Sequence, residues 1–370
     1  MNLSYWEYKT WLSNIDFTVV GSGIVGLSCA LRLKEKFPKA KILVLERGVL
    51  PNGASTKNAG FACFGSLSEI IEDLNSHAEE EVLQLIEKRT QGLELLRKNL
   101  GDRAIEYVQY GGYELFTKED KYLYEECLSE RKRINSLLYP IFQEQVFIQK
   151  ENIFGFKNIE SHYFVNRFEG QIDTGKMMEA LLKKVQIAGI KILNNCNLEE
   201  INERITSVEL KTNLVTFYTT KLLIATNGFA SQLGIEHVKP ARAQVLITKP
   251  IKDLAIKGTF HLDRGYYYFR NIDNRILLGG GRNLNFKTEE TTEMAQTELV
   301  QQKLEEMLKK IVIPSFDFEI AHRWSGIMGI GNQKKSIINQ ISNHVFCGVR
   351  LGGMGVSIGS MVGRELADLL

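Results

Sequence analysis

The sequence predicts an α/β protein in which a Rossmann-like dinucleotide-binding domain is interleaved with an α+β domain built on a mainly antiparallel sheet. Two observations support this fold class. Residues 16–46 combine a strand, a glycine turn, a helix and a second strand, in the order of a βαβ unit. Residues 241–281 instead read as several strands with few helix signals. With 370 residues, 44% of them hydrophobic, the chain is long enough to bury two cores.

The glycine turn carries the pattern G-x-G-x-x-G directly after a buried strand, at Gly21, Gly23 and Gly26. The first glycine allows a tight turn, the second lets backbone approach a pyrophosphate, and the third lets helix and strand pack closely. The phosphates would rest on the N-terminus of the following helix, whose free N–H groups favour an anion. Glu46 follows the second strand, 20 residues after Gly26, the distance expected for an acid that binds a ribose 2′-hydroxyl.

Composition and charge narrow the range of partners. The net charge of +2, from 46 basic and 44 acidic residues, gives no general attraction to nucleic acid. The five cysteines form no C-x-x-C pair and the six histidines show no metal-ligand spacing, so we expect no metal site and no disulfide framework. No signal peptide or membrane-spanning segment is visible, and the cysteine usage suits a reducing compartment. We therefore expect a cytoplasmic protein that binds no nucleic acid.

A stretch poor in large apolar side chains, GASTKNAGFACFGS at residues 53–66, follows the second strand. Small residues let backbone lie close to a flat ring, with N–H groups free to bond it. The chain then enters a helical segment over residues 67–100, whereas an NAD enzyme would usually continue into further βα units. These features favour FAD over NAD. Cys63 lies just past the expected flavin contact, and by default we expect it to be a small buried residue.

Several motifs spread along the chain resemble one family. The segments VVGSGIVGLSCALRL…LVLERG and GASTKNAGF resemble the D-amino-acid oxidase superfamily, in particular its branch with glycine oxidase, sarcosine oxidase, D-amino-acid dehydrogenase and γ-glutamylputrescine oxidase. Further similar segments are GQIDTGKMMEALLKKVQIAGIKIL, KLLIATNGFAS, ARAQVLITKP, RGYYYFRNIDNRILLGGGRN and VFCGVRLGGMGVSIGSMVGRELADLL. The resemblance implies a GR2-type FAD-binding domain and the oxidation of an amine or amino acid. Because residues 322–340 hold no cysteine, where sarcosine oxidase-like members attach their flavin, we expect non-covalent FAD.

The two domains are expected to alternate along the chain. We assign residues 1–104, 164–236 and 326–370 to the FAD-binding domain, and residues 105–163 and 237–325 to the substrate domain. Two further helices are expected. One begins after a cap at Asp173 or Thr174 and stops at Gly189, and another spans residues 290–311 and covers the substrate-domain sheet.

The expected cofactor contacts come from the glycine turn, the acid after the second strand, the small-residue stretch and the C-terminal glycine loop. They are Gly21, Gly23, Ile24, Val25, Gly26, Glu46, Arg47, Ser55, Thr56, Asn58, Ala59, Gly60, Phe61, Leu198, Ala225, Thr226, Gly228, Gly352, Gly353, Met354, Gly355 and Val356. The resemblance implies that residues 55–58 bind FAD between pyrophosphate and ring, and that residues 59–61 pass close to the isoalloxazine. The helix after Gly355 would direct its positive end at the negative charge of reduced flavin.

The expected reaction is oxidation of a C–N bond to an imine by hydride transfer to flavin N5, after which the imine is hydrolysed. It requires a neutral amine, which burial favours, and neither a nucleophile nor a metal. Tyr266 and Tyr268 are expected to form an aromatic cage, because strand alternation directs at most two of residues 266–268 to one side. Arg270 or Arg350 would bind the anionic end of the substrate, with Arg323 as a further candidate.

Two departures from the family bear on the substrate and the electron acceptor. Glycine oxidase-like members carry a W-x-G-x-R-P pattern whose arginine binds the substrate carboxylate, and here Met328 and Gly329 replace Arg-Pro. Sarcosine oxidase-like members place a lysine near flavin N5 to promote reaction with oxygen, and Leu277 aligns there. The acceptor, either O2 or a quinone or other carrier, therefore stays open, with a mild preference for slow reaction with oxygen.

Two other functions remain open at this point. The first is FAD-dependent oxidation of a 2-hydroxy acid or a glycerol-3-phosphate-like alcohol, for which His261 or His322 should approach the flavin as a base. The second is a non-catalytic flavoprotein subunit or a tRNA-modification flavoprotein, although the runs ERKRIN and NQKKS are too short to form a basic patch. The sequence does not indicate an oligomeric state.

Overall fold

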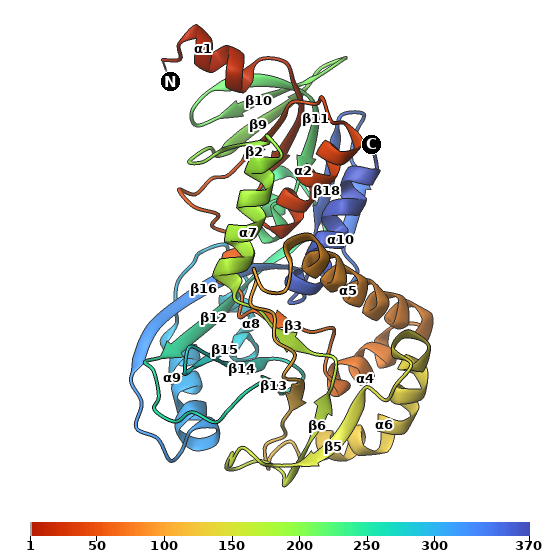
Figure 1. Cartoon of the computed structure of the whole chain (residues 1–370), viewed down its shortest axis with the longest axis vertical. Coiled ribbons are helices and arrows are strands. Elements are labelled where there is room, and N and C mark those ends of the chain that lie inside the picture. The colour runs from red at the N-terminus through yellow and green to blue at the C-terminus, as the bar shows by residue number, and fades with distance from the viewer. Residues whose placement is uncertain (1) are drawn as a thin grey trace.

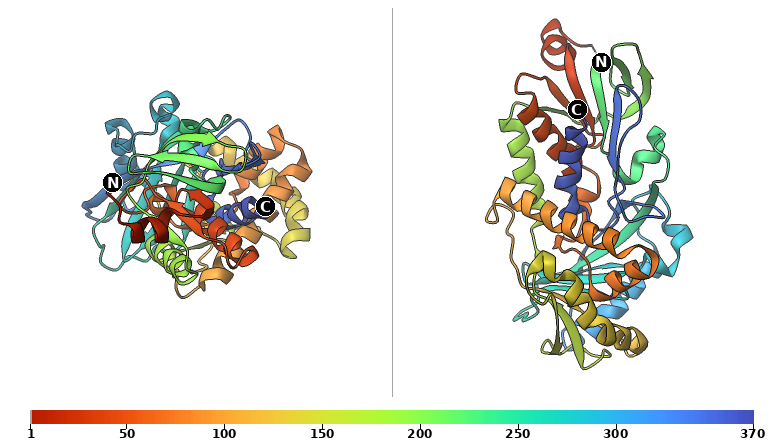
Figure 2. Two further views of the ribbon diagram at one scale, coloured as in Figure 1. Left: turned by 90° about the horizontal axis from the view of Figure 1, so that it is seen from above. Right: turned by 90° about the vertical axis from the view of Figure 1, so that its right-hand side faces the viewer.

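Two large sheets lie one above the other along the long axis of the molecule (Figure 1). The structure is a computed structural model that describes residues 2–370. Each large sheet has eight strands, and a small two-stranded sheet joins β3 (Phe61–Ala62) to β7 (Gly170–Gln171). Both ends of the described chain lie beside the first sheet (Figures 1 and 2).

The first sheet is parallel at its centre and carries the βαβ unit. Its main path runs in the order β17-β18-β11-β1-β2-β8, and β10 and β9 extend from β11 as antiparallel strands. The strands are β1 (Ile15–Val20), β2 (Ile42–Leu45), β8 (Lys191–Leu193), β9 (Leu198–Glu203), β10 (Val208–Thr212), β11 (Thr216–Ile224), β17 (Ile337–Gln340) and β18 (Val345–Val349). The four residues of β2 and all five of β18 are buried, as expected for strands covered on both faces.

Helices pack on the first sheet where glycines allow close approach. They are α2 (Ile24–Lys36), α7 (Thr174–Ile187), α10 (Gly355–Asp368) and α5 (Glu79–Leu100), and Figure 2 shows α10 running alongside α2. A Cβ added to Gly363 would lie 2.4 Å from the Val25 carbonyl oxygen, so α10 can approach α2 only through glycine. Helix α7 begins where expected, because the Asp173 side chain accepts from the Lys176 N–H at 2.9 Å. Beyond its end, Gly189 adopts a φ of +75°.

The second sheet is mainly antiparallel, as the sequence predicts. It runs in the order β16-β12-β15-β14-β13-β4-β6-β5, and only the pair of β13 with β4 is parallel within this sheet of the described chain. Its strands are β4 (Gly112–Glu114), β5 (Phe147–Glu151), β6 (His162–Asn166), β12 (Lys239–Thr248), β13 (Thr259–Leu262), β14 (Tyr267–Ile272), β15 (Arg275–Gly280) and β16 (Ile320–Ile330).

The helical segment expected over residues 67–100 is divided. It forms α4 (Leu67–Ser76) and α5, because residues 77 and 78 are extended. The two helices pack against different partners: α4 lies on α6 (Lys121–Phe142), whereas α5 packs on α10. A single straight helix could not make both contacts.

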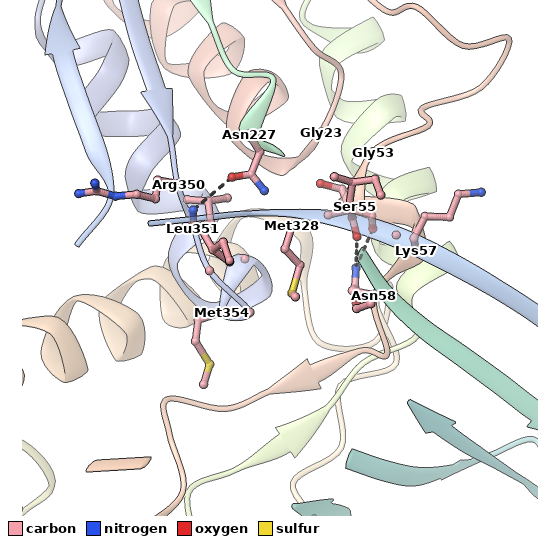
Figure 3. Close-up of a pocket in the computed structure, with 18 of the residues that line it drawn as sticks. Gly23, Gly53, Ser55, Lys57, Asn58, Asn227, Met328, Arg350, Leu351 and Met354 are labelled. Atoms are coloured by element: carbon pink, nitrogen blue, oxygen red, sulfur yellow. Dashed lines mark hydrogen bonds between the residues drawn. The ribbon is translucent and has the colours of Figure 1, made fainter. Parts of the chain in front are cut away.

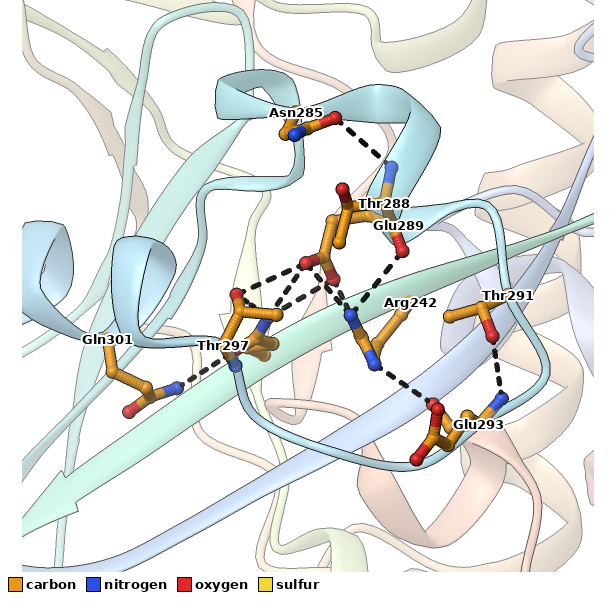
Figure 4. A network of polar contacts seen from close by, with 9 residues as sticks. Arg242, Asn285, Thr288, Glu289, Thr291, Glu293, Thr297 and Gln301 are labelled. Atoms are coloured by element: carbon orange, nitrogen blue, oxygen red, sulfur yellow. Dashed lines mark hydrogen bonds and ion pairs between the residues drawn. The ribbon is translucent and has the colours of Figure 1, made fainter.

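The helix expected over residues 290–311 is shorter. It begins at α9 (Glu298–Met307) and continues into the π-helical turn η4 (Leu308–Val312). Residues before α9 are held by the polar network in Figure 4, in which Arg242 and Glu289 form a buried ion pair at 2.7 Å. The Thr297 N–H is bonded by the Gln244 side chain at 2.9 Å, so this segment uses side chains of β12 in place of helical hydrogen bonds.

Short helices complete the described chain. They are α1 (Tyr5–Glu7), η1 (Tyr8–Leu12), α3 (Ala54–Lys57), η2 (Asn227–Leu233), η3 (Arg282–Leu284) and α8 (Phe286–Glu289). Within residues 2–370, no helix has the length and apolarity needed to cross a membrane.

Segments far apart in the sequence alternate between the two large sheets. Residues near positions 15–45, 191–224 and 337–349 build the first sheet, and residues near 112–166 and 239–330 build the second. The expected boundaries at residues 163/164 and 325/326 fall inside β6 and β16, both strands of the second sheet. We therefore propose domain boundaries that follow the ends of these two strands.

Candidate functional site

A cavity of about 1000 Å³ lies between the two sheets. The first sheet contributes the glycine turn and Glu46, and the small-residue stretch contributes most of residues 53–61. The second sheet and its connections contribute Tyr266, Tyr268 and Met328. Figure 3 shows part of this wall, where Met328 lies between Asn58 on one side and Met354 on the other. The residues that line the cavity come both from the end of β1 and from the second sheet.

The glycine turn at the end of β1 requires residues without a Cβ. Gly21 has a φ of +103°, and a Cβ there would lie 2.8 Å from the carbonyl oxygen of Ala225. A Cβ on Gly26 would lie 1.9 Å from the carbonyl oxygen of Gly21, so α2 can pack on the turn only with glycine at this position. Gly23 faces the Ser55 side chain, and a Cβ added to Gly23 would lie 2.8 Å from the Ser55 hydroxyl oxygen. The geometry is a backbone cradle at the start of α2.

Polar side chains close this cradle at two points. The Glu46 carboxylate is 5% exposed and accepts from the Ser22 hydroxyl at 2.6 Å and from the Gly48 N–H at 2.8 Å. These bonds fix the carboxylate at the carboxyl end of β2, facing the cavity. The Ile24 N–H, the first free donor of α2, is bonded by the Ser55 hydroxyl at 2.9 Å. The Glu46 carboxylate is therefore placed to bind a ribose hydroxyl, and the N-terminus of α2 is placed to bind a pyrophosphate.

Asn58 organises the small-residue stretch. Its amide donates to the Ser55 carbonyl at 2.8 Å, its side-chain oxygen accepts from the Gly60 N–H at 2.8 Å, and the Thr174 hydroxyl donates to the same oxygen at 3.0 Å. Gly60 follows with a φ of +74°. The stretch is thus a rigid loop tied to the start of α7, and its backbone passes along the cavity.

The loop before α10 forms the opposite end of the same wall. Residues 352–356 line the cavity, and Gly352 has a φ of +59°. The Leu351 N–H donates to the Asn227 side chain at 3.2 Å, as Figure 3 shows. The Ser357 hydroxyl in the first turn of α10 donates to the Cys63 carbonyl. The 14-residue helix therefore presents its positive end to the cavity next to the small-residue stretch.

Most of the expected cofactor contacts line this cavity, and four do not. Those that line it are Gly21, Gly23, Ile24, Val25, Glu46, Arg47, Ser55, Asn58, Ala59, Phe61, Leu198, Ala225, Thr226, Gly352, Gly353, Met354, Gly355 and Val356. Gly26 packs against the turn behind it, and the Thr56 hydroxyl donates to the Pro51 carbonyl at 2.8 Å. Gly60 packs on Arg270, and Gly228 lies under the backbone of Met328. These four support the lining from behind.

The tyrosines at 266–268 have different surroundings. Tyr268 lines the cavity from β14, and Tyr267 is buried in the core on the other face. Tyr266 lies in the turn before β14, where it lines the cavity and also packs against that core. The Tyr268 ring packs edge-on against Phe61, with ring centroids 5.6 Å apart. Burial raises the pKa of Tyr268 to about 12, so its phenol stays neutral at physiological pH.

The three arginines considered for the substrate are engaged elsewhere or lie behind the wall. Arg270 does not line the cavity: it is 2% exposed, and its guanidinium packs beneath Gly60. Arg323 pairs with Glu305 at 2.7 Å on the outer side of the sheet. Arg350 lines the cavity, but its guanidinium donates to the backbone carbonyl of residue 335 at 2.7 and 2.9 Å and points away from Met328 in Figure 3.

The sequence named Cys63 and His261 singly, but it did not predict that they meet the buried Glu169 at the cavity wall. Cys63, Glu169 and His261 have potential ligand atoms within 4.8 Å of one another, although their spacing in the sequence gives no signal. The His261 ring bonds the Glu169 carboxylate at 3.0 Å, and the Thr259 hydroxyl donates to the same oxygen at 3.2 Å. His322, the other histidine considered as a base, does not line the cavity.

Opposing effects act on the His261 imidazole. Burial lowers its pKa, but the charge and hydrogen bond of Glu169, with smaller contributions from Glu69 and Glu114, raise it to about 9. The imidazole is therefore protonated at neutral pH and has no lone pair to offer a proton or a metal ion. Burial also raises the pKa of the Cys63 thiol, which stays protonated.

A glycine turn and a helix N-terminus that face one cavity between a parallel and an antiparallel sheet define a class: dinucleotide-binding oxidoreductases of two interleaved domains. The chain belongs to the DAO family of FAD dependent oxidoreductases, whose sequence profile matches residues 16–369. It is therefore an FAD-dependent enzyme, and the cradle at Gly21 and Gly23, the buried Glu46 and the start of α10 fit this cofactor.

Known proteins of this fold act on several substrates. The chain is 21% identical over 377 residues to the probable oxidoreductase OrdL of Haemophilus influenzae, in an alignment that covers 98% of this chain and 84% of that protein. Its fold is similar to that of glycine oxidase from Geobacillus kaustophilus, with a TM-score of 0.75, 18% identity, and coverage of 96% of this chain and 94% of that one. L-proline dehydrogenase from P. horikoshii gives a TM-score of 0.72, 18% identity, and coverage of 96% and 93%.

Proposed function

We propose that the protein oxidises the C–N bond of an amine or amino acid to an imine, which water then hydrolyses. The observation that supports this proposal is the aromatic wall next to the flavin-binding loop, where the Tyr268 ring packs edge-on against Phe61 and Tyr266 lines the same cavity; we call these three residues the aromatic cage. When bound, FAD accepts two electrons and a proton from the substrate carbon. The similar structures are named as a glycine oxidase and an L-proline dehydrogenase, names that give an amino acid as the substrate, which agrees with this proposal.

The residues of the cage prepare the substrate by excluding water. Phe61 packs on Tyr268 and also on the His261 ring, with centroids 5.2 Å apart, so this part of the wall is aromatic. An ammonium ion loses hydration on entering such a site, which lowers its pKa and favours the neutral amine needed for oxidation. The neutral phenol of Tyr268 can orient the amine by hydrogen bonding without adding a charge.

Oxidation of an alcohol is the second candidate, and the contacts of His261 argue against it. An alcohol must lose its hydroxyl proton, so a base has to face the substrate. His261 lines the cavity, but its bond to Glu169 and a pKa of about 9 keep it protonated at neutral pH. It therefore cannot accept the proton of a hydroxyl group.

Anaerobic reduction of the holoenzyme tests the proposal. The purified protein, saturated with FAD, is mixed with a panel of amines, D-amino acids, N-methyl amino acids and 2-hydroxy acids, and the loss of visible flavin absorbance is followed. Amines or amino acids should bleach the flavin, and ammonia or a smaller amine should be released. Bleaching by hydroxy acids alone would contradict the proposal. Tyr268→Phe should slow bleaching, whereas Tyr267→Phe, in the core on the other face, serves as the matched control.

Repeating the active mixture in air then addresses the electron acceptor. Leu277 is 5% exposed and packs with Ala59 and Val245 beside the expected flavin contact, so a side chain without charge stands in this region. We propose that the reduced enzyme reacts slowly with oxygen and passes its electrons to a quinone or another carrier. Peroxide formed in proportion to substrate, at the rate of the anaerobic half-reaction, would show an oxidase instead.

A further inference from the structure

Five arginines line the cavity, and one of them is left without a polar partner near the aromatic cage. The five are Arg47, Arg89, Arg264, Arg282 and Arg350. Arg89 donates to the Phe64 carbonyl at 2.7 Å, and Arg350 donates to backbone carbonyls. Arg264 lies near the Tyr122 ring and is influenced by Glu72, and Arg47 stacks on Phe229 at the dinucleotide end. The Arg282 backbone carbonyl accepts from the Asn285 N–H at 3.3 Å, but its guanidinium makes no hydrogen bond or ion pair with any residue between 2 and 370.

The position of Arg282 is fixed by backbone and by aromatic rings. Gly281 adopts a φ of +82°, and its N–H donates to the Tyr266 carbonyl at 3.0 Å, so the next residue emerges beside Tyr266. The Arg282 guanidinium carbon lies 5.2 Å from the centroid of the Tyr266 ring and 5.1 Å from that of Phe286. The side chain is half-buried between the end of β15 and the mouth of the cavity.

Contacts with two aromatic rings orient a guanidinium without consuming its hydrogen bonds. The Tyr266 and Phe286 ring planes are inclined at 67°, and the guanidinium carbon lies close to both ring centroids, so both rings attract its positive charge without taking up its N–H donors. The rings of Tyr266 and Phe286 thus hold Arg282 while its donors stay free. A preorganised guanidinium fork with free donors matches the two oxygens of a carboxylate.

The second sheet also places Arg282 at a useful distance from the aromatic cage. Tyr266, in the turn before β14, and Tyr268, in β14, both line the cavity, and two residues of chain span at most about 7 Å. Arg282 lies beside the first and Phe61 beside the second. The reacting C–N bond at the cage and an anionic group at Arg282 can therefore belong to one small molecule. Met328, where the family pattern has an arginine, offers no charge.

We propose that Arg282 binds the carboxylate of the substrate, so that the enzyme acts on amino acids in preference to amines that lack a carboxylate. This inference rests on the proposed function, because it assigns the substrate class of the same cavity. Arg282 belongs to the connection after β15, whereas the family pattern places its arginine on the segment corresponding to β16.

Binding of a non-reacting carboxylate tests the assignment without turnover. Benzoate and its neutral analogue benzamide are titrated into the FAD-saturated protein, and the perturbation of the visible flavin spectrum gives each dissociation constant. Because a bidentate charge-assisted pair is lost, Arg282→Gln should weaken benzoate binding about 10- to 100-fold. Binding of benzamide should not change. Arg282→Lys, which keeps the charge but not the fork, should weaken benzoate binding by a smaller factor.

Arg323→Gln is the matched control. It removes one positive charge from the same domain, but Arg323 is held by Glu305 and Gln301 and does not line the cavity. Benzoate binding should be unchanged in this variant. Equal weakening in the Arg323 and Arg282 variants would overturn the proposal, and so would an Arg282→Gln variant that binds benzoate as tightly as the wild type does. If Arg282→Gln fails to retain FAD, Arg282→Lys decides the outcome alone.

Turnover separates this inference from the proposed function. Phenylglycine and benzylamine share a ring and an amine and differ in the carboxylate, so kcat/KM is compared for the two in the wild type and in Arg282→Gln. The preference for phenylglycine should fall about 10- to 100-fold in the variant. If no amine or amino acid reduces the wild type, the proposed function fails, while the benzoate titration still reports on Arg282. An unchanged preference, with both compounds oxidised, would overturn the role of Arg282 alone.

Discussion

The two walls of the cavity use different parts of the chain. The first-sheet wall presents backbone and small side chains: the glycine turn, the stretch at residues 53–60 and the loop before α10. The second-sheet wall presents large side chains from neighbouring strands, such as Tyr268 and His261, which are paired across β14 and β13. A cofactor common to a whole family suits a wall of backbone, whereas a substrate is selected by side chains that can change without changing the fold.

This contrast predicts that the first-sheet wall does not tolerate even the addition of one methyl group at its glycines. Gly26→Ala places a Cβ 1.9 Å from the carbonyl oxygen of Gly21, and backbone atoms cannot move aside there. We expect loss of bound FAD and a destabilisation of about 3 kcal/mol or more, the upper range for overpacking. The bound flavin is measured from the visible spectrum after purification, and the stability from thermal unfolding.

Gly175→Ala is the control for that variant, because Gly175 is exposed in the first turn of α7 and does not line the cavity. The only atom within 4 Å of an added Cβ is the Asp173 Oδ1, at 3.2 Å. The Gly175 variant should purify with FAD and unfold as the wild type does. If the Gly26 variant did the same, the close approach of α2 to the turn would not be needed for the cofactor site.

The second-sheet wall should be sensitive to charge, and the buried pair of Glu169 and His261 provides the test. The pKa of His261 is raised by Glu169 to about 9 in the folded protein, above the unfolded value of about 6.5. The stability from this pair is therefore fully present below pH 6.5 or so and is lost as the pH rises through about 9. The difference corresponds to at most about 3 kcal/mol.

Chemical denaturation across this pH range, in the wild type and in Glu169→Gln, measures the contribution. The variant should be less stable at pH 6 and should lose less stability than the wild type between pH 6 and pH 9. Thr259→Val, which removes a supporting hydroxyl 3.2 Å from Glu169 but keeps both charges, should retain most of the wild-type pH dependence. Parallel pH profiles for the wild type and Glu169→Gln would show that the pair does not titrate as described.

The same contrast explains what the sequence could reveal. The glycine pattern, the strand lengths and the cap at Asp173 are local, because each depends on residues close together in the chain, and the structure places β1, α2, β2 and α7 within a few residues of expectation. The fold class was accessible for this reason. Tyr266 and Tyr268 both line the cavity, although Tyr266 lies in the turn before β14 and strand alternation does not set its direction.

Contacts between distant segments gave no such signal. Glu169 and His261 are 92 residues apart and meet only because the sheet places β4 between β13, which carries His261, and β6, which precedes Glu169. In the sequence Arg282 simply follows a run of glycines. Its proposed role depends on its contacts with the rings of Tyr266 and Phe286, which the sequence does not reveal. Arg270 was expected to bind the substrate, yet strand register and loop packing place it behind Gly60. To predict where such side chains lie, the register of the sheet must be known, and composition and spacing do not give that register.

A smaller loss of FAD binding is expected when a single polar side chain of the first-sheet wall, that of Ser55, is removed. The Ser55 hydroxyl accepts from the Ile24 N–H at 2.9 Å and lies at the start of α2, where the pyrophosphate is expected. Ser55→Ala removes this bond but leaves the glycine cradle intact, so FAD binding should weaken by about 1 kcal/mol, or roughly fivefold. Ser136→Ala, on the exposed face of α6 and outside the cavity lining, is the control. The dissociation constant of FAD is measured by flavin fluorescence on adding FAD to the apoprotein. A loss as complete as that of Gly26→Ala would mean that Ser55, and not the backbone cradle alone, carries the dinucleotide site.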